Sequence, residues 1–152
     1  MTSRISLLFL VGFSLLSACS KNAANPDLLK IQGDWVVIGD TSGRGDTGHM
    51  TLKSDETFVS DYTQPASSDG KTKSLTETYS GTYTVREESL AGANVTKVEL
   101  TILMENGKPT KSSGPIQLFY DPAGNMLHDM MTVAYARPGD EQRARDRLKR
   151  DK

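Results

Sequence analysis

The chain has 152 residues, of which 36% are hydrophobic and 24% are charged, and its formal net charge is −1. Without its first 18 residues it has 134, with 17 basic and 19 acidic side chains, which is the size of one domain. This near-neutral balance gives no electrostatic reason to expect nucleic acid as a partner. The single cysteine excludes an internal disulfide.

The N-terminus has the pattern of a secretory signal. Arg4 precedes an apolar run from Ile5 to Leu16, which is followed by small residues and Cys19. The run is too short to be a membrane-spanning helix, which needs about 20 apolar residues. We therefore expect residues 1–18 to be a signal peptide that is removed.

The residues Leu16-Ser17-Ala18-Cys19 resemble the lipobox of bacterial lipoproteins, which is Leu, a small residue, Ala or Gly, then Cys. The resemblance implies that Cys19 receives a diacylglyceryl thioether, becomes the N-terminus and is N-acylated. Several acyl chains would hold the protein stably in a lipid bilayer. In this family the next residue directs sorting, and Ser20 implies the outer membrane, facing the periplasm. The alternative is an ordinary secretory signal with a chance cysteine.

We expect residues 19–27 to comprise the acylated cysteine and a flexible tether, and residues 28–137 to form the folded domain. A single helical turn is expected before a strand that begins near Trp35. The segment 39–48 holds four glycines and no apolar anchor, so we expect an exposed loop. It lacks the Gly-Lys-Ser/Thr ending of a P-loop.

From His49 onward, apolar and polar residues alternate with the two-residue period of β-strands. Gly81 lies in the middle of the clearest strand and indicates a bend or bulge, and Asn106-Gly107 predicts a two-residue hairpin turn. About seven or eight strands joined by hairpin-length loops predict an all-β, antiparallel up-and-down barrel, with a sandwich as the alternative. The predicted strands after the first are His49–Lys53, Phe58–Tyr62, Leu75–Val85, Val95–Met104, Ile116–Tyr120 and Met126–Arg137.

We expect the remaining residues, 138–152, to form a charged C-terminal tail. Pro138-Gly139 ends the last strand, and beyond it only Ala144 and Leu148 are apolar. A helix there would be weakly amphipathic and would dock loosely at best.

With Gly33-x-Trp35 at the start of the first strand and Arg137 at the end of the last, the domain resembles the lipocalin-like (calycin) barrels. In that superfamily the tryptophan lies across one end of the barrel and packs against the arginine. The resemblance implies a cation–π contact between Trp35 and Arg137, worth about 0.5–2 kcal/mol, as a structural signature.

A candidate ligand cavity follows from the odd-numbered face of the strand Leu75–Val85. If this face points inward, it places Leu75, Glu77, Tyr79 and Tyr83 inside, with tyrosine hydroxyls as polar groups for a ligand. Glu77 would then be an inward charge that must be paired, hydrated or near an open mouth. The alternative is that Glu77 lies at a barrel end or that the face is misassigned.

Reactive groups are few. His49 and His128 are far apart in the sequence, and no Gly-x-Ser-x-Gly nucleophile motif is present. We therefore expect no metal, no cofactor and no enzymatic activity.

These patterns lead to one expected function and one alternative. The first is a membrane-anchored lipoprotein that binds a small hydrophobic or amphipathic ligand in its barrel, with the loop Gly39–Gly48 as a lid by analogy with the family. The alternative is a periplasm-facing protein-binding module, such as a hydrolase inhibitor, an immunity protein or an accessory of envelope assembly. An empty cavity favours the first, and a barrel filled by its own side chains favours the second.

Overall fold

The computed structural model describes residues 26–40, 45–68, 70–111, 114–129 and 133–150. The predicted signal peptide, Cys19 and most of the tether lie outside these residues. In the described parts of the chain, no helix is long and apolar enough to cross a membrane. The elements are α1 (Pro26–Ile31), β1 (Gly33–Asp40), β2 (Thr47–Leu52), β3 (Thr57–Gln64), β4 (Leu75–Leu90), β5 (Ala93–Glu105), β6 (Lys108–Pro109), β7 (Ile116–Asp121), β8 (Met126–His128), β9 (Val133–Ala136) and α2 (Glu141–Arg150).

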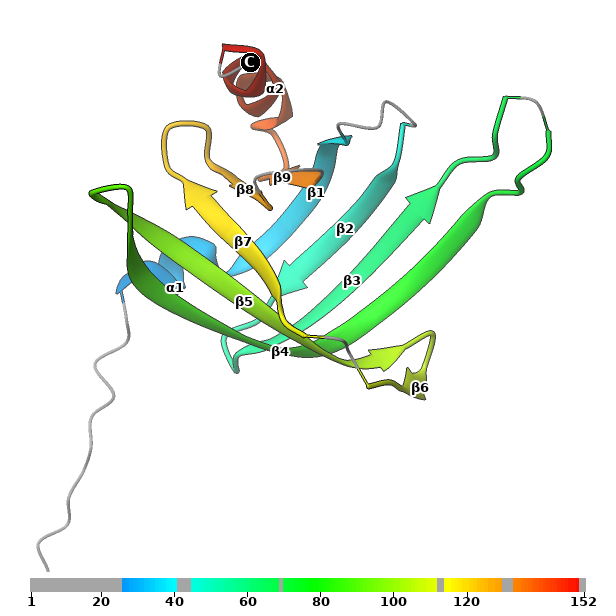
Figure 1. Cartoon of the computed structure of the whole chain (residues 1–152), viewed down its shortest axis with the longest axis horizontal. Helices are drawn as coiled ribbons and strands as arrows, with labels where there is room; N and C mark the ends of the chain where they lie inside the picture. The colour runs from blue at the N-terminus through cyan, green and yellow to red at the C-terminus, as the bar shows by residue number, and fades with distance from the viewer. Residues whose placement is uncertain (1–25, 41–44, 69, 112–113, 130–132, 151–152) are drawn as a thin grey trace, which may run out of the picture.

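The strands form one closed antiparallel barrel (Figure 1). Strands β1 to β5 pair in chain order, β5 then pairs with β7, and β7, β8 and β9 follow in order. The pairing of β9 with β1 closes the ring. The short strand β6 pairs with β5 and lies outside the ring. The predicted lipocalin-like, up-and-down barrel is confirmed, with eight strands in the ring, and the sandwich is excluded.

The predicted single strand Met126–Arg137 is wrong, because the chain forms a hairpin there. Strands β8 and β9 pair antiparallel, with Leu127 opposite Tyr135. Asp129 closes the hairpin, since its backbone nitrogen donates to the carbonyl of Val133 at 3.1 Å and its carboxylate accepts from the Val133 nitrogen at 3.0 Å. An aspartate can therefore close a turn in a segment that contains neither glycine nor proline.

The predicted exposed loop 39–48 is shorter than expected. Strand β1 continues to Asp40 and β2 begins at Thr47, and residues 41–44 lie outside the described residues. Gly48 is buried, because a Cβ there would lie 2.3 Å from the carbonyl oxygen of Asp61 on β3. The missing side chain at Gly48 therefore allows β2 and β3 to pack closely, and it is not a sign of a mobile loop.

The predicted bulge at Gly81 is confirmed. The register of β4 against β5 shifts between Ser80 and Gly81. A Cβ at Gly81 would lie 1.9 Å from the carbonyl oxygen of Thr101, so only glycine allows the strands to approach so closely.

One end of the barrel is closed by α1 and by Trp35, and we call it the closed end. Trp35 is fully buried, and its indole Nε1 donates to the carbonyl of Ile31 at 2.9 Å. The guanidinium of Arg137 lies 4.0 Å from the centre of the indole ring, so the predicted contact is present. The buried residues of the interior are Ile31, Trp35, Met50, Leu52, Phe58, Tyr83, Val98, Leu100, Leu118 and Leu127.

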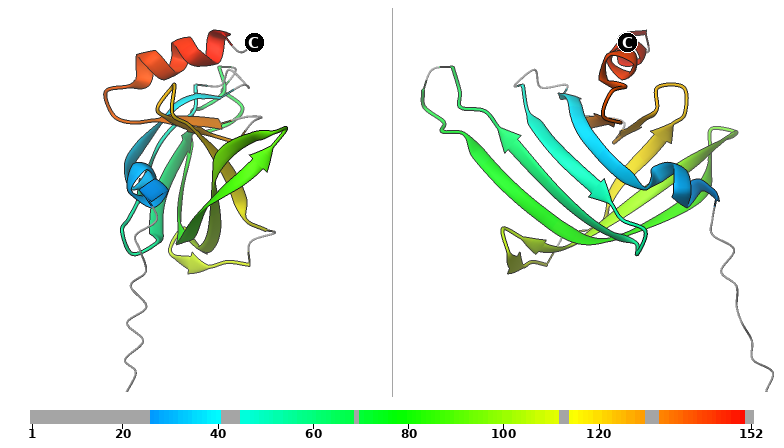
Figure 2. Two further views of the ribbon diagram at one scale, coloured as in Figure 1. Left: turned by 90° about the vertical axis from the view of Figure 1, so that its left-hand side faces the viewer. Right: turned by 180° about the vertical axis from the view of Figure 1, so that it is seen from behind.

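Helix α2 packs on the outer face of the barrel (Figure 2). The expectation of a loosely docked tail is wrong, because Ala144 is fully buried in a second cluster. Ala134 and Ala136 of β9 belong to this cluster, and their small side chains let the helix approach the strand. The Arg147 guanidinium also pairs with Asp121 at 3.1 Å.

We predict that Gly33→Ala destabilises the barrel by about 2–3 kcal/mol. Gly33 has φ of 111°, which L-residues rarely adopt, and a Cβ there would lie 2.6 Å from Nη1 of Arg137. Urea unfolding measures the change. The matched control is Gly39→Ala in the same strand, where no atom lies within 4 Å of an added Cβ. Equal stability of the two variants would contradict the prediction.

Candidate functional site

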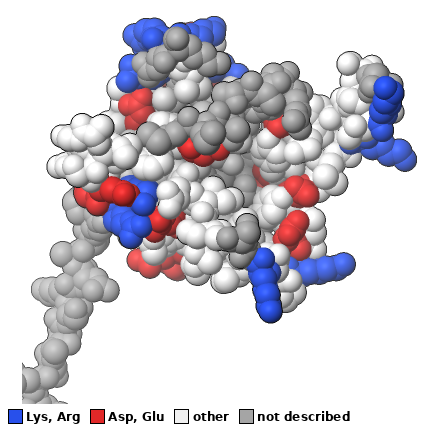
Figure 3. All heavy atoms as spheres, viewed as in Figure 1, with Lys and Arg blue, Asp and Glu red and all other residues white. Residues whose placement is uncertain are grey.

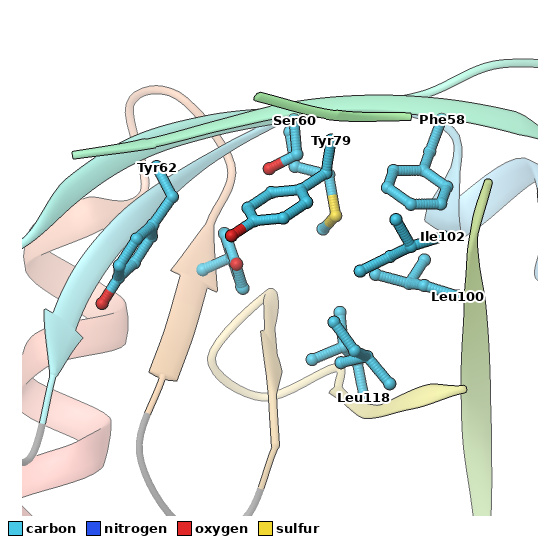
Figure 4. A pocket seen from close by; sticks show the side chains of 10 residues that line it. Phe58, Ser60, Tyr62, Tyr79, Leu100, Ile102 and Leu118 are labelled. Carbon is cyan, nitrogen blue, oxygen red and sulfur yellow. The ribbon is translucent and has the colours of Figure 1, made fainter. Parts of the chain in front are cut away.

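The barrel encloses a cavity of about 90 Å³ (Figure 4). Its wall is mostly apolar, and the labelled side chains Phe58, Leu100, Ile102 and Leu118 surround a common space with the ring of Tyr79. The described residues that line it are Met50, Phe58, Ser60, Tyr62, Tyr79, Leu100, Ile102, Ile116, Leu118 and Tyr135.

The cavity lies between the core and the end of the barrel opposite α1. Met50, Phe58, Leu100 and Leu118 belong to the buried interior, so they form its floor. Ile116 begins β7, lines the cavity and is 44% exposed. It therefore marks the rim at which the cavity meets solvent, and we call this the open end.

Of the four residues predicted for the cavity, Tyr79 lines it and Glu77 lies beside it. The Tyr79 hydroxyl donates to Glu77 Oε2 at 2.5 Å. Tyr83 is buried in the interior, and its hydroxyl donates to the carbonyl of Lys53 at 2.6 Å. Leu75 is 50% exposed at the start of β4, and neither it nor Tyr83 is among the described lining residues. The four were predicted on one face, but the cavity spans only part of β4: Leu75 lies at the start of the strand, and Tyr83 belongs to the packed core.

Two carboxylates meet the cavity wall near the open end. Asp46 is 9% exposed and its Oδ2 accepts a hydrogen bond from the hydroxyl of Tyr62, which lines the cavity. Tyr62 lies directly opposite Glu77 in the pairing of β3 with β4. Two acid–tyrosine pairs therefore lie side by side: Asp46 with Tyr62, and Glu77 with Tyr79.

The hydroxyls of two cavity tyrosines, Tyr79 and Tyr135, remain protonated well above neutral pH. Burial, followed by the hydrogen bond to Glu77, raises the pKa of Tyr79 above its usual value of 10.0. Burial and then the charge of Asp129 raise the pKa of Tyr135 to about 12. Tyr79 and Tyr135 therefore act as neutral hydroxyl groups in the cavity wall.

Sequence reasoning missed Asp46 and Tyr62 as cavity residues. Asp46 was assigned to an exposed glycine-rich loop, and Tyr62 to a strand whose inward face was not assigned. The available signal was spacing, since Asp46, Gly48, Met50 and Leu52 alternate with exposed or half-buried residues and are themselves buried. Extending the strand pattern backward by two-residue steps would have placed Asp46 on the inner face.

The described residues contain no group of three or more His, Cys, Asp or Glu that could hold a metal ion. His49 is exposed on β2, and His128 lies on β8 with its ring 6.5 Å from that of Phe119. The two histidines are therefore on different strands of the barrel.

Charge is unevenly distributed over the surface. In the view of Figure 3 acidic side chains lie around the centre, whereas basic side chains gather over α2 and at the margins. Basic residues are concentrated in α2, which carries Arg143, Arg145, Arg147, Lys149 and Arg150.

No protein-family model, curated protein or solved structure matches this chain. The fold and the cavity therefore define the class: a lipocalin-like, eight-stranded antiparallel barrel, which is compatible with ligand binding.

We predict that Tyr135 makes stability fall between pH 10 and pH 12. The pKa of Tyr135 rises from 10.0 in the unfolded chain to about 12 in the folded one, so its contribution is complete below pH 10 and is lost as the pH approaches 12. The loss is on the order of 2 kcal/mol. Denaturant unfolding across this range measures it. Tyr135→Phe should show a shallower fall, and identical pH profiles for both proteins would exclude Tyr135 as the group.

Proposed function

We propose that this protein is an outer-membrane lipoprotein, anchored through acylated Cys19 and facing the periplasm, whose barrel binds a small amphipathic ligand without catalysing a reaction. The proposed anchor is supported by the lipobox Leu16-Ser17-Ala18-Cys19 and by the absence of any other cysteine. The helix α1 begins at Pro26, so a short segment separates the proposed anchor from the barrel.

One observation carries the ligand-binding proposal. The cavity has an apolar floor, tyrosine hydroxyls on its wall and an exposed rim at Ile116. A preformed apolar pocket with a few polar groups is the usual architecture of a small-molecule site. Apolar burial would supply the affinity, and the polar groups near the open end would orient the ligand.

The cavity volume limits the ligand. About 90 Å³ is well below the roughly 300–1,000 Å³ of sites for drug-sized molecules. The site therefore suits a short apolar chain, with the rest of the ligand outside the rim.

The small cavity also favours the alternative, a periplasmic protein-binding module that acts through its outer surface. Val59 on β3 is 45% exposed and Leu103 on β5 is 49% exposed. Both lie next to Ser80 of β4, since Val59 is its direct partner and Leu103 lies at the bulge. These exposed apolar side chains offer a contact surface for a hydrolase or an envelope protein.

We predict that Cys19→Ser releases the protein from the membrane. Without the thiol there is no site for the thioether, so the chain should no longer incorporate labelled palmitate and should leave the membrane fraction. The matched variant Ser20→Asp keeps the thiol and should stay lipidated but move to the inner membrane. Membrane association of Cys19→Ser at the level of the unmodified protein would contradict the proposed anchor.

We predict that Ile102→Trp abolishes binding of a neutral probe with a short apolar chain, hexanol. Ile102 lines the cavity, so an indole there fills the space that the probe needs. The matched control is Leu103→Trp, the next residue on the same strand, whose side chain is 49% exposed. Hexanol is titrated into both variants by calorimetry, and circular dichroism checks that each remains folded. Equal binding by both variants, or none by the unmodified protein, would favour the protein-binding alternative.

A further inference from the structure

We propose that the ligand carries a positively charged nitrogen, as a protonated amine or a quaternary ammonium, which binds among Asp46, Glu77 and the tyrosines at the open end. This inference rests on the proposed ligand-binding function and names the chemical class of the ligand.

The first argument is a buried carboxylate with a free oxygen. Asp46 is 9% exposed, and Tyr62 donates to its Oδ2, but Oδ1 has no hydrogen-bond partner among the described residues. A buried carboxylate that is incompletely paired is unfavourable, because it has lost its water without gaining a counter-charge. A cation bound beside Tyr62 would supply the missing partner.

The second argument is a second carboxylate nearby. The cross-strand row Gly48, Tyr62 and Glu77 joins β2, β3 and β4 at one level of the barrel, and Asp46 lies two residues before Gly48. Asp46 and Glu77 therefore flank the same tyrosine. No described residue forms an ion pair with either of them, so their charge is available to a ligand.

The third argument is the aromatic wall. Tyr62, Tyr79 and Tyr135 line the cavity from β3, β4 and β9. The face of an aromatic ring attracts a cation, and several rings around one site are a common solution for quaternary ammonium groups. The hydrogen bonds of Tyr62 to Asp46 and of Tyr79 to Glu77 hold two of these rings in place.

The remaining lining fits this assignment. None of the ten described residues that line the cavity is charged, and the two carboxylates reach its wall through their hydrogen bonds with Tyr62 and Tyr79. No basic side chain in the lining therefore competes for these carboxylates. The described residues also provide no cluster of three acidic or histidine side chains for a divalent metal. An organic cation with a short apolar chain matches both the carboxylates bonded to Tyr62 and Tyr79 and the apolar floor.

The test compares three ligands with the same short chain: hexyltrimethylammonium, hexanol and hexanesulfonate. Calorimetric titrations use the secreted, acyl-free chain from residue 20 to 152, which contains both hydrophobic clusters. We expect the cation to bind at least tenfold more tightly than hexanol, and hexanesulfonate to bind most weakly. Equal affinity for all three would overturn the charge inference and leave the ligand-binding function standing. No binding of any of the three would overturn both.

The variants Asp46→Asn and Glu77→Gln identify the carboxylates. Each should weaken hexyltrimethylammonium binding roughly tenfold, about 1.4 kcal/mol, and leave hexanol binding unchanged. The matched control is Asp61→Asn, which removes a carboxylate next to Tyr62 on the opposite face of β3 and should change neither affinity. If Asp46→Asn fails to fold, Glu77→Gln and the ligand comparison still decide the question. Unchanged cation binding in Glu77→Gln, or a loss in Asp61→Asn, would contradict the assignment.

Discussion

The guanidinium of Arg137 holds together three parts of the chain that are distant in sequence. It lies over the ring of Trp35 at 4.0 Å, and its Nη2 donates to the carbonyl of Lys30 at 2.5 Å. Its position directly after β9 ties the end of the barrel to α1 and to the start of β1. Gly33 leaves the space in which the guanidinium lies. The ring of strands, and hence the interior that it encloses, depends on this contact at the closed end.

Much of the fold could be predicted because its signals are local. The alternation in Leu75–Val85 and Val95–Met104 reflects the two-residue period of a strand with one buried face. Gly81 marks a bulge because a side chain cannot fit against Thr101. The pair Trp35 and Arg137 indicated closure only through the resemblance to lipocalin-like barrels, in which a tryptophan and an arginine at these positions pack together.

The features that could not be predicted depend on tertiary contacts. The hairpin of β8 and β9 is closed by hydrogen bonds between Asp129 and Val133, in a segment without the usual turn residues. Helix α2 has a weak apolar face, and it docks because the partner strand presents alanines and because Arg147 meets Asp121. Docking of this kind depends on complementary surfaces, which the helix sequence alone does not reveal.

The candidate site was predicted in part for a similar reason. Glu77 and Tyr79 were found because strand alternation assigns faces. Asp46 was missed because glycines on both sides suggested a loop, whereas Gly48 is required by close packing against Asp61. The same glycine-rich composition can therefore indicate either an open loop or a tightly packed strand, and only the neighbouring strand decides between them.

The position of α1 has a consequence for orientation. Under the proposed anchoring, six residues separate Cys19 from Pro26, and the seven Cα-to-Cα steps between these two residues span at most roughly 25 Å. Helix α1 lies at the closed end, so this end would be held near the bilayer and Ile116 at the rim would point away from it. Such a protein would collect its ligand from the aqueous periplasm, and the plugged base, with Trp35 and Ile31, would separate the cavity from the lipid.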